Sequence, residues 1–493
     1  MKHTISFTIP KQVSHVTTTL QDAGYEAYLI GGCVRDLCMG ITPKDWDITT
    51  NATPEQVIPL FEKAVHENNF GMVAIVHEDE PLDSPYRAIE VTTYRSETTY
   101  SNNRHPDSIT YATTLSEDVQ RRDFTMNALA YDVRAGEIID HYNGLQDIKD
   151  KRIVTVGQAH ERFEEDALRI LRALRFSAQL RFDIEELTEK GIYDYARNLT
   201  SISAERIRDE FIKLIMSDHP MHGLQLTLTH GALEYISPEL KEGVGVDQSR
   251  NHVYDVWEHC LRALQKTADE QWPLYLRLAA LFHDVGKPRT KRWDKEQKIH
   301  TFYGHEVVGA RMVEQWMKRL RFSKELTKRV TLLVRYHMFF SDPEQITLSA
   351  ARRMIRNVGK ENIWELMKLR RADRIGMGRP KAAPYRLRKY EAMIEEALRD
   401  PISVQQLKID GDYMIRDMGM QPGPRMGWIL HALLDEVLED PKRNTHTWLT
   451  ERTRDLDELD DDTLKKLGEK GKDKKEAYDQ AEIKKLHKKH GVA

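Results

Sequence analysis

The chain has 493 residues, of which 40% are hydrophobic and 31% are charged, and its formal net charge is −4. This composition is typical of a soluble globular protein with several domains. It excludes a uniformly basic nucleic-acid binder, so RNA binding would need local basic patches. No apolar run is long enough to span a membrane, and the amino end has no signal-peptide core. Because Cys33, Cys38 and Cys260 form neither a disulfide framework nor a metal motif, we expect a cytoplasmic protein.

The first part of the chain predicts a mixed sheet backed by helices. Apolar periodicity predicts an amphipathic helix within residues 11–28, and the sequence Thr53-Pro54-Glu55-Gln56 is typical of a helix cap and first turn. Residues 71–76 and 86–94 have the composition of strands. Residues 95–118 are polar and contain a proline, which predicts a loop followed by a short strand.

Residues 29–50, between the first helix and this cap, contain the strongest indication of chemistry. Asp45 and Asp47 stand two apart beside β-branched residues, so on a strand both carboxylates would project from one face and could share Mg²⁺. The Gly31-Gly32 pair upstream would let backbone N–H groups approach a triphosphate. Glu90, on a later strand, is a candidate third carboxylate. The alternatives are a solvated Asp-x-Asp surface and a structural role for Glu90.

Two further segments have side chains suited to a nucleotide. In residues 121–128, RRDFTMNA, guanidinium groups suit phosphate and the Asp123 carboxylate suits ribose hydroxyls, although a buried Arg–Asp pair would also explain the pattern. Residues 140–147 form a polar turn, and long amphipathic helices follow. The helix expected at 164–176 has an apolar face and an opposite face with Asp166, Arg169 and Arg172. A solvated face of salt bridges is the alternative there.

Histidines and aspartates gather again after residue 250. His283-Asp284 ends the apolar run 276–282, and Gly-Lys-Pro follows it. Imidazole and carboxylate ligands from several helices suit a divalent transition metal that acidifies a bound water for phosphoester hydrolysis. The complete candidate set is His259, His283, Asp284, His305, His337 and Asp373.

These motifs resemble those of two known families. The pattern GG-x-V-R-D-x(3)-G-x(4)-D-x-D is similar to the signature of class II tRNA nucleotidyltransferases and bacterial poly(A) polymerases, within the DNA polymerase β nucleotidyltransferase superfamily. It is carried by Gly31, Gly32, Val34, Arg35, Asp36, Gly40, Asp45 and Asp47. RRDFT-x-NA resembles the ribose motif of that family, and E-D-x-x-R resembles its amino-acid template for the incoming base. The later H…HD…D pattern resembles the HD phosphohydrolase superfamily.

The first resemblance implies a role for each matching residue. Asp45 and Asp47 would be catalytic and hold Mg²⁺, and Asp123 would contact the ribose 2′-hydroxyl. Asp166 and Arg169 would read the base. The remaining nucleotide-binding positions implied by the family are Gly32, Arg35, Arg122, Arg172 and Arg175. The segment 95–118 matches a flexible loop of the family and has its full length here.

The resemblances together predict an α+β protein with a polymerase-β-like nucleotidyltransferase head of mixed sheet and helices, followed by an all-α neck, HD domain and tail. The expected domains are the catalytic head at 1–150, the neck with the base template at 151–235, the HD domain at 236–400, a helical tail at 401–450 and a charged extension at 451–493. In the tail, G-x-x-PGP is expected to precede a helix. The extension predicts solvated helix or disorder.

The implied function is CCA addition to tRNA 3′ ends, with CMP, CMP and AMP transferred from CTP and ATP and pyrophosphate released. The implied partners are the tRNA 3′ end, ATP and CTP, and the implied cofactors are Mg²⁺ and a second divalent metal (Mn, Ni, Fe, Co or Mg) in the HD site. The enzymatic alternatives are an A-adding enzyme and a poly(A) polymerase, although the HD domain argues against the latter. An alternative of another class is a non-catalytic tRNA-binding or nucleotide-binding protein, which intact Asp45 and Asp47 disfavour.

Overall fold

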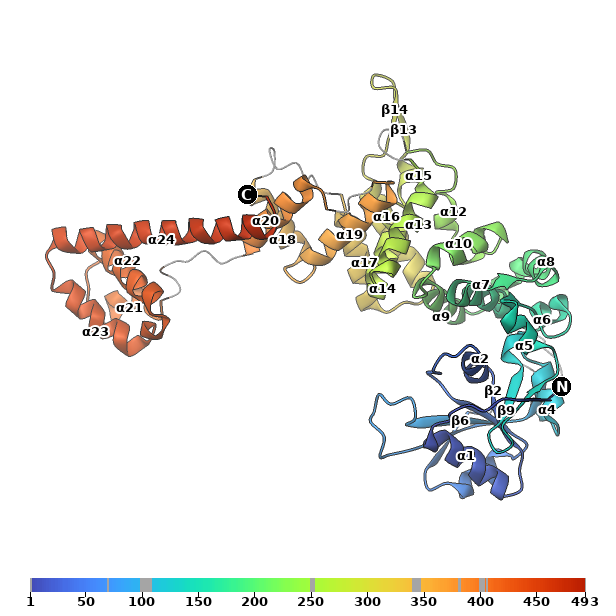
Figure 1. Cartoon of the computed structure of the whole chain (residues 1–493). Coiled ribbons are helices and arrows are strands. Elements are labelled where there is room, and N and C mark those ends of the chain that lie inside the picture. Colours follow the sequence, from blue (N-terminus) through green and yellow to red (C-terminus); the bar gives the residue numbers. More distant parts are fainter. Residues whose placement is uncertain are drawn as a thin grey trace. The chain divides into compact units, whose positions relative to one another are not determined.

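The computed structural model describes residues 2–68, 71–97, 109–248, 253–338, 347–379, 383–398, 404 and 407–492. The chain forms two compact units, Met1–His337 with Ala372–Pro380, and Met338–Arg371 with Lys381–Ala493 (Figure 1). The first unit contains a sheet and many helices, and the described part of the second is helical. This architecture confirms the predicted α+β class with a sheet at the amino-terminal end.

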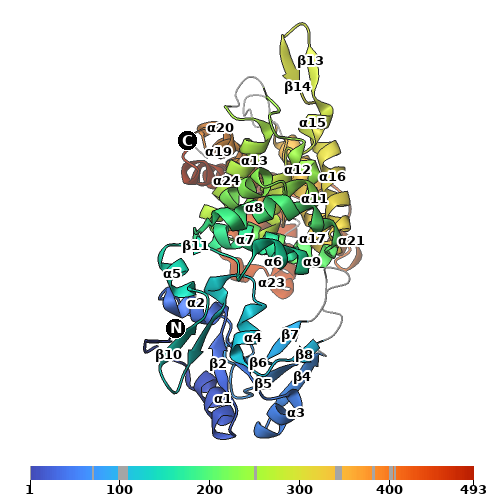
Figure 2. The same ribbon diagram turned by 90° about the vertical axis from the view of Figure 1, so that its right-hand side faces the viewer.

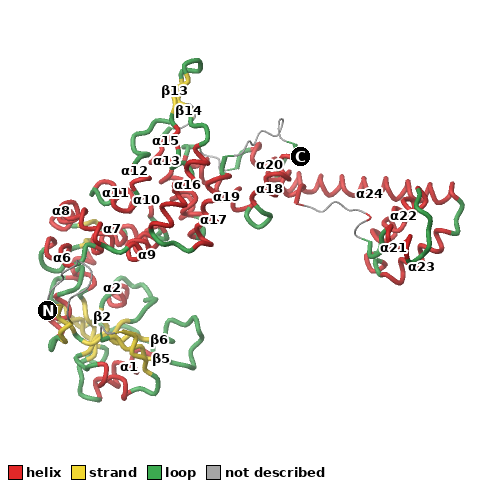
Figure 3. Tube along the Cα trace, turned by 180° about the vertical axis from the view of Figure 1, so that it is seen from behind, coloured by secondary structure: helices red, strands yellow, loops and turns green. Residues whose placement is uncertain are grey.

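The head of the first unit is an eight-stranded mixed sheet with strand order β1-β10-β9-β2-β3-β6-β5-β4 (yellow in Figure 3). Its strands are β1 (Lys2–Thr4), β2 (Ala27–Ile30), β3 (Asp47–Thr50), β4 (Ala64–Asn68), β5 (Met72–Val76), β6 (Ala88–Thr93), β9 (Leu129–Asp132) and β10 (Glu137–Asp140). Only the central pair β3–β6 is parallel, and every other neighbouring pair is antiparallel. β7 (Arg95–Glu97) and β8 (Ile109–Tyr111) form a separate ladder.

Helices cover both faces of the head sheet because alternate strand residues are apolar on each side. The helix α1 (Lys11–Asp22) buries Val13, Val16 and Leu20 in one core, together with side chains of β2, β3, β5, β6 and β9. The helix α4 (Leu115–Gln120) contributes Leu115 and Val119 to a second core. The remaining head helices are α2 (Gly32–Cys38), α3 (Pro54–Val57) and α5 (Gly144–Lys149), with 3₁₀ turns at Ile58–Leu60 and Thr125–Asn127.

Most expected elements of the head are present. The first helix, the two strands and the cap are confirmed, and Thr53 and Gln56 form a reciprocal capping box at α3. The expectation of a loop and short strand over 95–118 was wrong at its carboxyl end. There Thr114 caps α4, and the Glu117 side chain accepts the Thr114 N–H. The flexible-loop prediction falls on residues 98–108, which lie outside the described residues.

Helices make up most of the rest of the first unit. They are α6 (Ala159–Glu165), α7 (Leu168–Leu180), α8 (Glu186–Tyr195), α9 (Ala204–Ile215), α10 (Pro220–Thr229), α11 (Leu233–Ile236), α12 (Pro238–Lys241), α13 (Val256–Asp269), α14 (Leu274–Phe282), α15 (Lys287–Thr290), α16 (His305–Arg319) and α17 (Lys324–Tyr336). A 3₁₀ stretch lies at Ala196–Ser201. Two small ladders join β11 (Arg152–Ile153) to β12 (Asp183–Ile184) and β13 (Arg292–Asp294) to β14 (Ile299–Thr301). The helix α19 (Ile363–Gly376) ends in this unit.

The continuous helix expected at 164–176 was wrong, because it is broken at Asp166. α6 ends at Glu165, Asp166 adopts an extended backbone with φ −148° and ψ 100°, and α7 begins at Leu168. The Asp166 carboxylate accepts the Leu168 N–H at 3.1 Å, which satisfies a free donor at the new helix start. The alternative of a solvated face does not hold for Arg169, which is 8% exposed.

The second unit contains α18 (Leu348–Val358), α20 (Tyr385–Leu398), α21 (Gly411–Arg416), α22 (Pro424–Glu439), α23 (His446–Asp457) and α24 (Asp461–Lys489). The helix predicted after G-x-x-PGP is α22. The helix predicted as one alternative for 451–493 is present as α23 and α24, but α24 is not solvated on every side, because it packs on α22 and α20. A Cβ on Gly468 would lie 2.7 Å from Trp428 Cα, so α24 needs this glycine for its close approach to α22.

None of the described helices combines the length and apolar composition needed to cross a bilayer.

Candidate active sites

The glycine turn between β2 and α2 brings charged groups of the head together. Gly31 has φ 82°, in the region that favours glycine, and it precedes the first turn of α2. A Cβ at Gly31 would lie 3.1 Å from Arg122 Nη1 and 3.9 Å from Asp47 Oδ2. A side chain here would therefore crowd the guanidinium and the carboxylate. At Gly32 a Cβ would meet Arg35 Nη2 at 3.7 Å.

Asp45 and Asp47 line one pocket with Gly32, Arg35 and Lys44. The expectation that both aspartates lie on a strand was wrong for Asp45, because β3 begins at Asp47. Side chains from the helices after the head complete the pocket wall, namely Gln179, Leu180, Met216, Ser217, Asp218 and Gln271. Asp166 and Arg169 are absent from the lining that these described residues form.

The electrostatics of Asp47 fit a bound cation. Burial raises the pKa of the Asp47 carboxyl, Arg122 lowers it and the negative charge of Asp45 raises it further. Within the described residues, neither carboxylate has an ion-pair or hydrogen-bond partner. Two adjacent unpaired carboxylates suit a hard divalent cation, which would relieve their repulsion. Glu90 on β6 is the parallel register partner of Asp47, so the candidate third carboxylate lies on the neighbouring strand.

Arg122 is held by a carboxylate that the sequence patterns did not indicate. Asp118 on α4 is fully buried and pairs with Arg121 at 2.8 Å and with Arg122 at 3.3 Å, while Thr49 donates to it at 3.2 Å. Burial opposes ionisation of Asp118, but the two guanidinium groups lower its pKa overall. Asp118 thus positions Arg122 beside β3. Its only local indication is its three- and four-residue spacing from the two arginines.

Asp123 and Arg172 form an ion pair between the head and α7. Arg172 lies 2.6 Å from Asp123 Oδ2, and the Phe124 N–H and the Asn127 amide donate to Asp123 Oδ1. Burial opposes ionisation, but Arg172, Asn127 and Arg169 together hold the pKa of Asp123 at about 2. The buried Arg–Asp pair considered from the sequence is therefore present.

The two residues expected to read a base are also engaged by neighbours. The Asp166 carboxylate accepts hydrogen bonds from both Nη atoms of Arg206, at 3.2 and 2.6 Å. Arg169 donates to Glu165 Oε2 at 2.5 Å and to the carbonyl of Arg121 at 2.8 Å. Arg169 therefore contacts the residue next to Arg122. Arg206 lies in the segment 203–207, which resembles a helix opening of the family's neck, but no sequence pattern indicated its contact with Asp166.

Three arginines surround the Phe176 ring on α7. The guanidinium carbons of Arg35, Arg172 and Arg175 lie 5.1, 5.6 and 4.0 Å from the ring centroid. Arg175 pairs with buried Glu210 at 2.8 Å, and burial lowers its pKa to about 10 despite that partner. Arg35 also donates to the Asn127 side chain at 2.8 Å. The structure thus gathers predicted nucleotide-binding arginines from the head and α7 around one aromatic ring, which the sequence patterns did not indicate.

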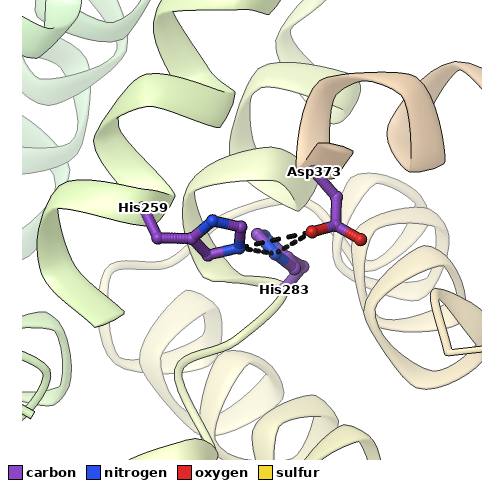
Figure 4. Close-up of side chains that lie close together, drawn as sticks. All are labelled: His259, His283 and Asp373. Atoms are coloured by element: carbon purple, nitrogen blue, oxygen red, sulfur yellow. Dashed lines mark hydrogen bonds and ion pairs between the residues drawn. The ribbon is translucent and has the colours of Figure 1, made fainter. Parts of the chain in front are cut away.

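The six residues expected to ligate a metal after residue 250 meet in one buried cluster. His259 lies on α13, His283 and Asp284 follow α14, His305 begins α16, His337 follows α17 and Asp373 lies on α19. None of the six is more than 5% exposed. Figure 4 shows His259, His283 and Asp373 converging from three different segments.

The cluster divides into two groups of three candidate ligands, in which the ligand atoms lie within 4.8 Å of one another. One group is His259, His283 and Asp373, and the other is Asp284, His305 and His337. Asp284 reaches both groups, because its Oδ2 is 3.0 Å from His259 Nε2 and its Oδ1 is 3.2 Å from His305 Nε2. Such a carboxylate could bridge two ions.

Backbone carbonyls set the orientation of three of the imidazoles. The Nδ1 atoms of His283, His305 and His337 lie 2.7–2.8 Å from the carbonyl oxygens of Ala280, Phe302 and Val334, so each Nδ1 carries the proton in the neutral ring. Their Nε2 lone pairs then face the cluster centre, as metal ligation requires. Nε2 of His283 lies only 2.8 Å from Nε2 of His259. This donor set suits divalent transition metals.

Lys287 pairs with this cluster, at 2.6 Å from Asp284 Oδ2. Burial lowers the pKa of His283, but Asp284 and Asp373 outweigh it and raise the value to about 10. Burial lowers the pKa of His337 to about 4. Lys287 belongs to the Gly-Lys-Pro motif, whose pattern indicates no contact for it.

Sequence patterns of three families match successive parts of the chain. They are described as "Poly A polymerase head domain" at residues 27–154, "Probable RNA and SrmB- binding site of polymerase A" at 181–243 and "HD domain" at 251–378. The sheet head with its carboxylate pair and the imidazole cluster lie in the first and third of these regions. The chain is therefore a nucleotidyltransferase of the poly(A) polymerase type with an HD domain.

Relatives define the family more closely. The CCA-adding enzyme of Lactobacillus helveticus is 32% identical over 90% of this chain and 96% of its own length. The CCA-adding enzyme of Lactiplantibacillus plantarum is 32% identical over 86% of this chain and 90% of its own length. The chain belongs to the CCA-adding enzyme family of tRNA nucleotidyltransferases.

Solved structures agree with this assignment. The Bacillus stearothermophilus CCA-adding enzyme in complex with CTP has a TM-score of 0.60 and 26% identity, covering 91% of this chain and 99% of its own. The Thermotoga maritima CCA-adding enzyme complexed with tRNA shares the fold with a TM-score of 0.52 at 19% identity, covering 91% of this chain and 96% of its own.

Proposed function

We propose that this chain completes tRNA 3′ ends by adding CMP, CMP and AMP from CTP and ATP, with pyrophosphate released at each transfer. The observation that carries the proposal is the pair of unpaired carboxylates, Asp45 and Asp47, in a pocket with Arg35 and Lys44. The relatives solved with CTP and with tRNA support these substrates.

In the proposed reaction the chain's residues bind and orient the triphosphate. Arg35 and Arg122 would contact its phosphates, and the Gly31-Gly32 turn leaves room for it beside Asp47. Asp45 and Asp47 would hold Mg²⁺, which supplies charge neutralisation and lowers the pKa of the attacking ribose hydroxyl when bound. Asp118 fixes Arg122 so that this arginine need not reorganise.

Base selection is proposed to come from Asp166 and Arg169, without a nucleic-acid template. Cytosine and adenine present an amine where uracil and guanine present a carbonyl oxygen, and a carboxylate accepts from the amines but repels the carbonyls. Arg206 fixes the Asp166 carboxylate and Glu165 fixes Arg169. These pairs would orient the two side chains before a base arrives. Arg172 and Arg175 would add contacts to the nucleotide, and Asp123 to the ribose 2′-hydroxyl.

The test of this function is end extension of tRNA transcripts that stop before the first C, after the second C, or after the final A. We expect two additions to the first transcript with CTP alone and three with CTP and ATP together. The second transcript should accept one AMP and the third none. AMP addition restricted to the second transcript would indicate an A-adding enzyme, and long A tails would indicate a poly(A) polymerase. No addition at all would indicate a binding protein.

A second activity, metal-dependent phosphoester hydrolysis, is proposed for the HD domain. The close approach of the four imidazoles to the carboxylates of Asp284 and Asp373 supports it, because this arrangement suits one or two divalent ions. His259, His283 and Asp373 would hold one ion, and Asp284, His305 and His337 a second. The bound metal would make a coordinated water more acidic. The substrate class we propose is 2′,3′-cyclic nucleotides and cyclic-phosphate RNA ends.

Hydrolysis of 2′,3′-cyclic AMP by purified full-length protein tests this activity. We expect turnover with at least one of Mn²⁺, Ni²⁺, Co²⁺, Fe²⁺ and Mg²⁺, and no turnover after chelation. Absence of turnover with all five ions would make the HD domain a scaffold.

We also propose the bounds of the functional domains and a cellular location. The functional divisions are 1–150 for the head, 151–235 for the neck, 236–400 for the HD domain, 401–450 for the tail and 451–493 for the extension. A cytoplasmic location is supported by the free state of Cys33, Cys38 and Cys260, since burial raises the pKa of Cys33 to about 12 and makes its thiol unreactive.

A further inference from the structure

A projecting segment of the HD domain has surface chemistry that the proposed activities leave unexplained. Residues 287–303, here called the HD hairpin, comprise α15, the ladder of β13 and β14, Phe302 and Tyr303. They lie in the sequence between His283-Asp284 and His305. Figures 1 and 2 show the ladder extending away from the helices that carry these ligands.

The HD hairpin is strongly basic within an acidic chain. It has six lysines and arginines and only two acidic residues, whereas the whole chain has a net charge of −4. Lys287 pairs with Asp284, and Arg289 pairs with Glu242. The other four cations have no ion pair with any described residue, and they are Lys291, Arg292, Lys295 and Lys298. Asp294 cannot neutralise them fully, because its carboxylate also accepts the N–H groups of Glu296 and Gln297.

Two large aromatic side chains are exposed on the same segment. Trp293 is 54% exposed and Tyr303 is 83% exposed. Trp293 lies opposite His300 in the ladder, with the two ring centroids 5.0 Å apart and the planes at 67°. This contact fixes the indole while leaving much of it accessible. Exposed aromatic rings among unpaired cations are the features that bind single-stranded nucleic acid, by stacking on bases and neutralising phosphates.

The base of the HD hairpin is tied directly to the metal-ligand cluster. At its start Lys287 contacts Asp284, and at its end the carbonyl of Phe302 accepts from Nδ1 of His305 at 2.8 Å. The Lys287 ammonium also lies 5.8 Å from the centroid of the Phe302 ring. A Cβ on Gly286 would come 2.2 Å from the His305 carbonyl oxygen, so the two ends approach closely. The two ends of the HD hairpin therefore lie beside the cluster, and the ladder that carries Trp293 projects from this base.

We propose that the HD hairpin is the RNA-recognition arm of the HD centre, and that it binds a single-stranded RNA 3′ end. Trp293 stacks on a base, and Lys295 and Lys298 contact phosphates. The terminal cyclic phosphate is thereby directed towards His283 and Asp284. The catalytic part of this inference rests on the hydrolysis proposed for the HD domain. In that step a water oxygen bonds to phosphorus, one ribose P–O bond breaks, and the released ribose oxygen takes a proton.

The test compares two substrates in the full-length protein with the best metal. One is a short oligoribonucleotide ending in a 2′,3′-cyclic phosphate, and the other is bis(p-nitrophenyl) phosphate, which has no base. Trp293→Ala should raise KM for the oligoribonucleotide about tenfold and leave the small substrate unchanged. Trp293→Phe should restore much of the affinity. Tyr193→Ala, at a tyrosine on α8 that is 66% exposed, is the matched control.

The contribution of the lysine charges to RNA binding is tested by measuring affinity at several salt concentrations. Lys295→Glu combined with Lys298→Glu should flatten the slope of log affinity against log salt by about 1.4, the value for two phosphate contacts on a single strand. Nucleotide addition by the head should not change in any of these variants.

The outcomes separate this inference from the hydrolase proposal. Equal oligoribonucleotide KM in wild type, Trp293→Ala and the double lysine variant would overturn the recognition arm while leaving hydrolysis established. If wild type hydrolyses neither substrate, the hydrolase proposal fails. The arm is then decided by crosslinking of a 4-thiouridine oligoribonucleotide without metal. Crosslinks within 287–303 that disappear in Trp293→Ala would support it, and crosslinks only elsewhere would overturn it.

Discussion

The head site and the HD cluster, both in the first unit, balance their charges in different ways. Around the head site, the buried carboxylates of Asp118 and Asp123 pair with arginines, as does the carboxylate of Asp166. Arginine stays protonated at every physiological pH, so these pairs keep one geometry. In the HD cluster Lys287 pairs with Asp284, but the two carboxylates mainly face four imidazoles, whose charge changes with protons or metal.

This difference indicates what each site is built to accept. Around the head site, permanent charges fix the polar side chains, whereas Asp45 and Asp47 have no partner among the described residues and are available to a cation. The HD cluster instead directs all its ligand atoms inward, so the whole cluster is available to metal. Substitutions in the two sites should therefore have separable effects.

The largest effect is expected for Asp47→Asn in the head. Loss of one carboxylate from the cation site should lower nucleotide addition about 10³-fold, because metal stabilisation of the transition state amounts to several kcal/mol. Asp83→Ala, at an exposed aspartate on a loop, is the control. Single-turnover addition of CMP measures the effect, and a loss of less than tenfold in Asp47→Asn would remove Asp47 from the catalytic site.

The head site and the HD cluster are expected to work independently. His283→Ala removes an imidazole from the middle of the HD cluster, so hydrolysis of cyclic nucleotides should fall at least about 100-fold while nucleotide addition stays within twofold. Metal content by elemental analysis should fall in parallel. A parallel loss of addition would show that the two centres are not independent.

A smaller effect is expected for Asp118→Asn, which tests the idea that permanent ion pairs position the head arginines. The variant weakens the charged hydrogen bonds to Arg121 and Arg122, so KM for CTP and ATP should rise about tenfold while kcat changes less. Steady-state kinetics with both nucleotides separate the effect on KM from the effect on kcat. An unchanged KM would mean that Arg122 does not need Asp118.

The smallest effect on activity, with a measurable effect on stability, is expected for Asp123→Asn. The folded-state pKa of Asp123 is about 2, below the ordinary value of about 3.9, so its ionised form stabilises the folded protein by roughly 2 kcal/mol at pH 7. This contribution is fully present above about pH 4 and is lost as the pH falls through 2. Thermal unfolding should be measured for wild type and variant between pH 7 and pH 3. The difference between their Tm values should become smaller only below pH 4. A gap that already narrows between pH 7 and pH 5 would contradict the ion pair.

The sequence predicted the parts of this molecule whose chemistry is local. Gly31, Asp45 and Asp47 lie within one short segment, and His283 and Asp284 are adjacent. The break at Asp166 was missed because Ala167 and Leu171 continue the helical period of buried residues across it. Periodicity reports which side chains are buried, and it does not report one extended residue between two helices.

Partners distant in sequence were missed for a related reason. Arg206 pairs with Asp166 from another helix, and nothing in the local pattern specifies that pair. The packing of α24 was missed because it depends on Gly468 and Gly471, which allow close helix approach without adding an apolar stripe. A glycine has no apolar side chain, so hydrophobic patterning does not detect a helix contact that glycines make possible.

We propose that protein side chains held by permanent ion pairs select the incoming base. Incorporation kinetics with CTP, ATP, UTP and GTP on wild type and Asp166→Ala test it most directly. Wild type should use CTP and ATP only. Asp166→Ala should lower the C/U and A/G preference about tenfold to more than 100-fold, since each mismatched polar contact is worth about 1–3 kcal/mol. Unchanged ratios in Asp166→Ala would contradict the claim and leave the Asp166–Arg206 pair as a structural contact.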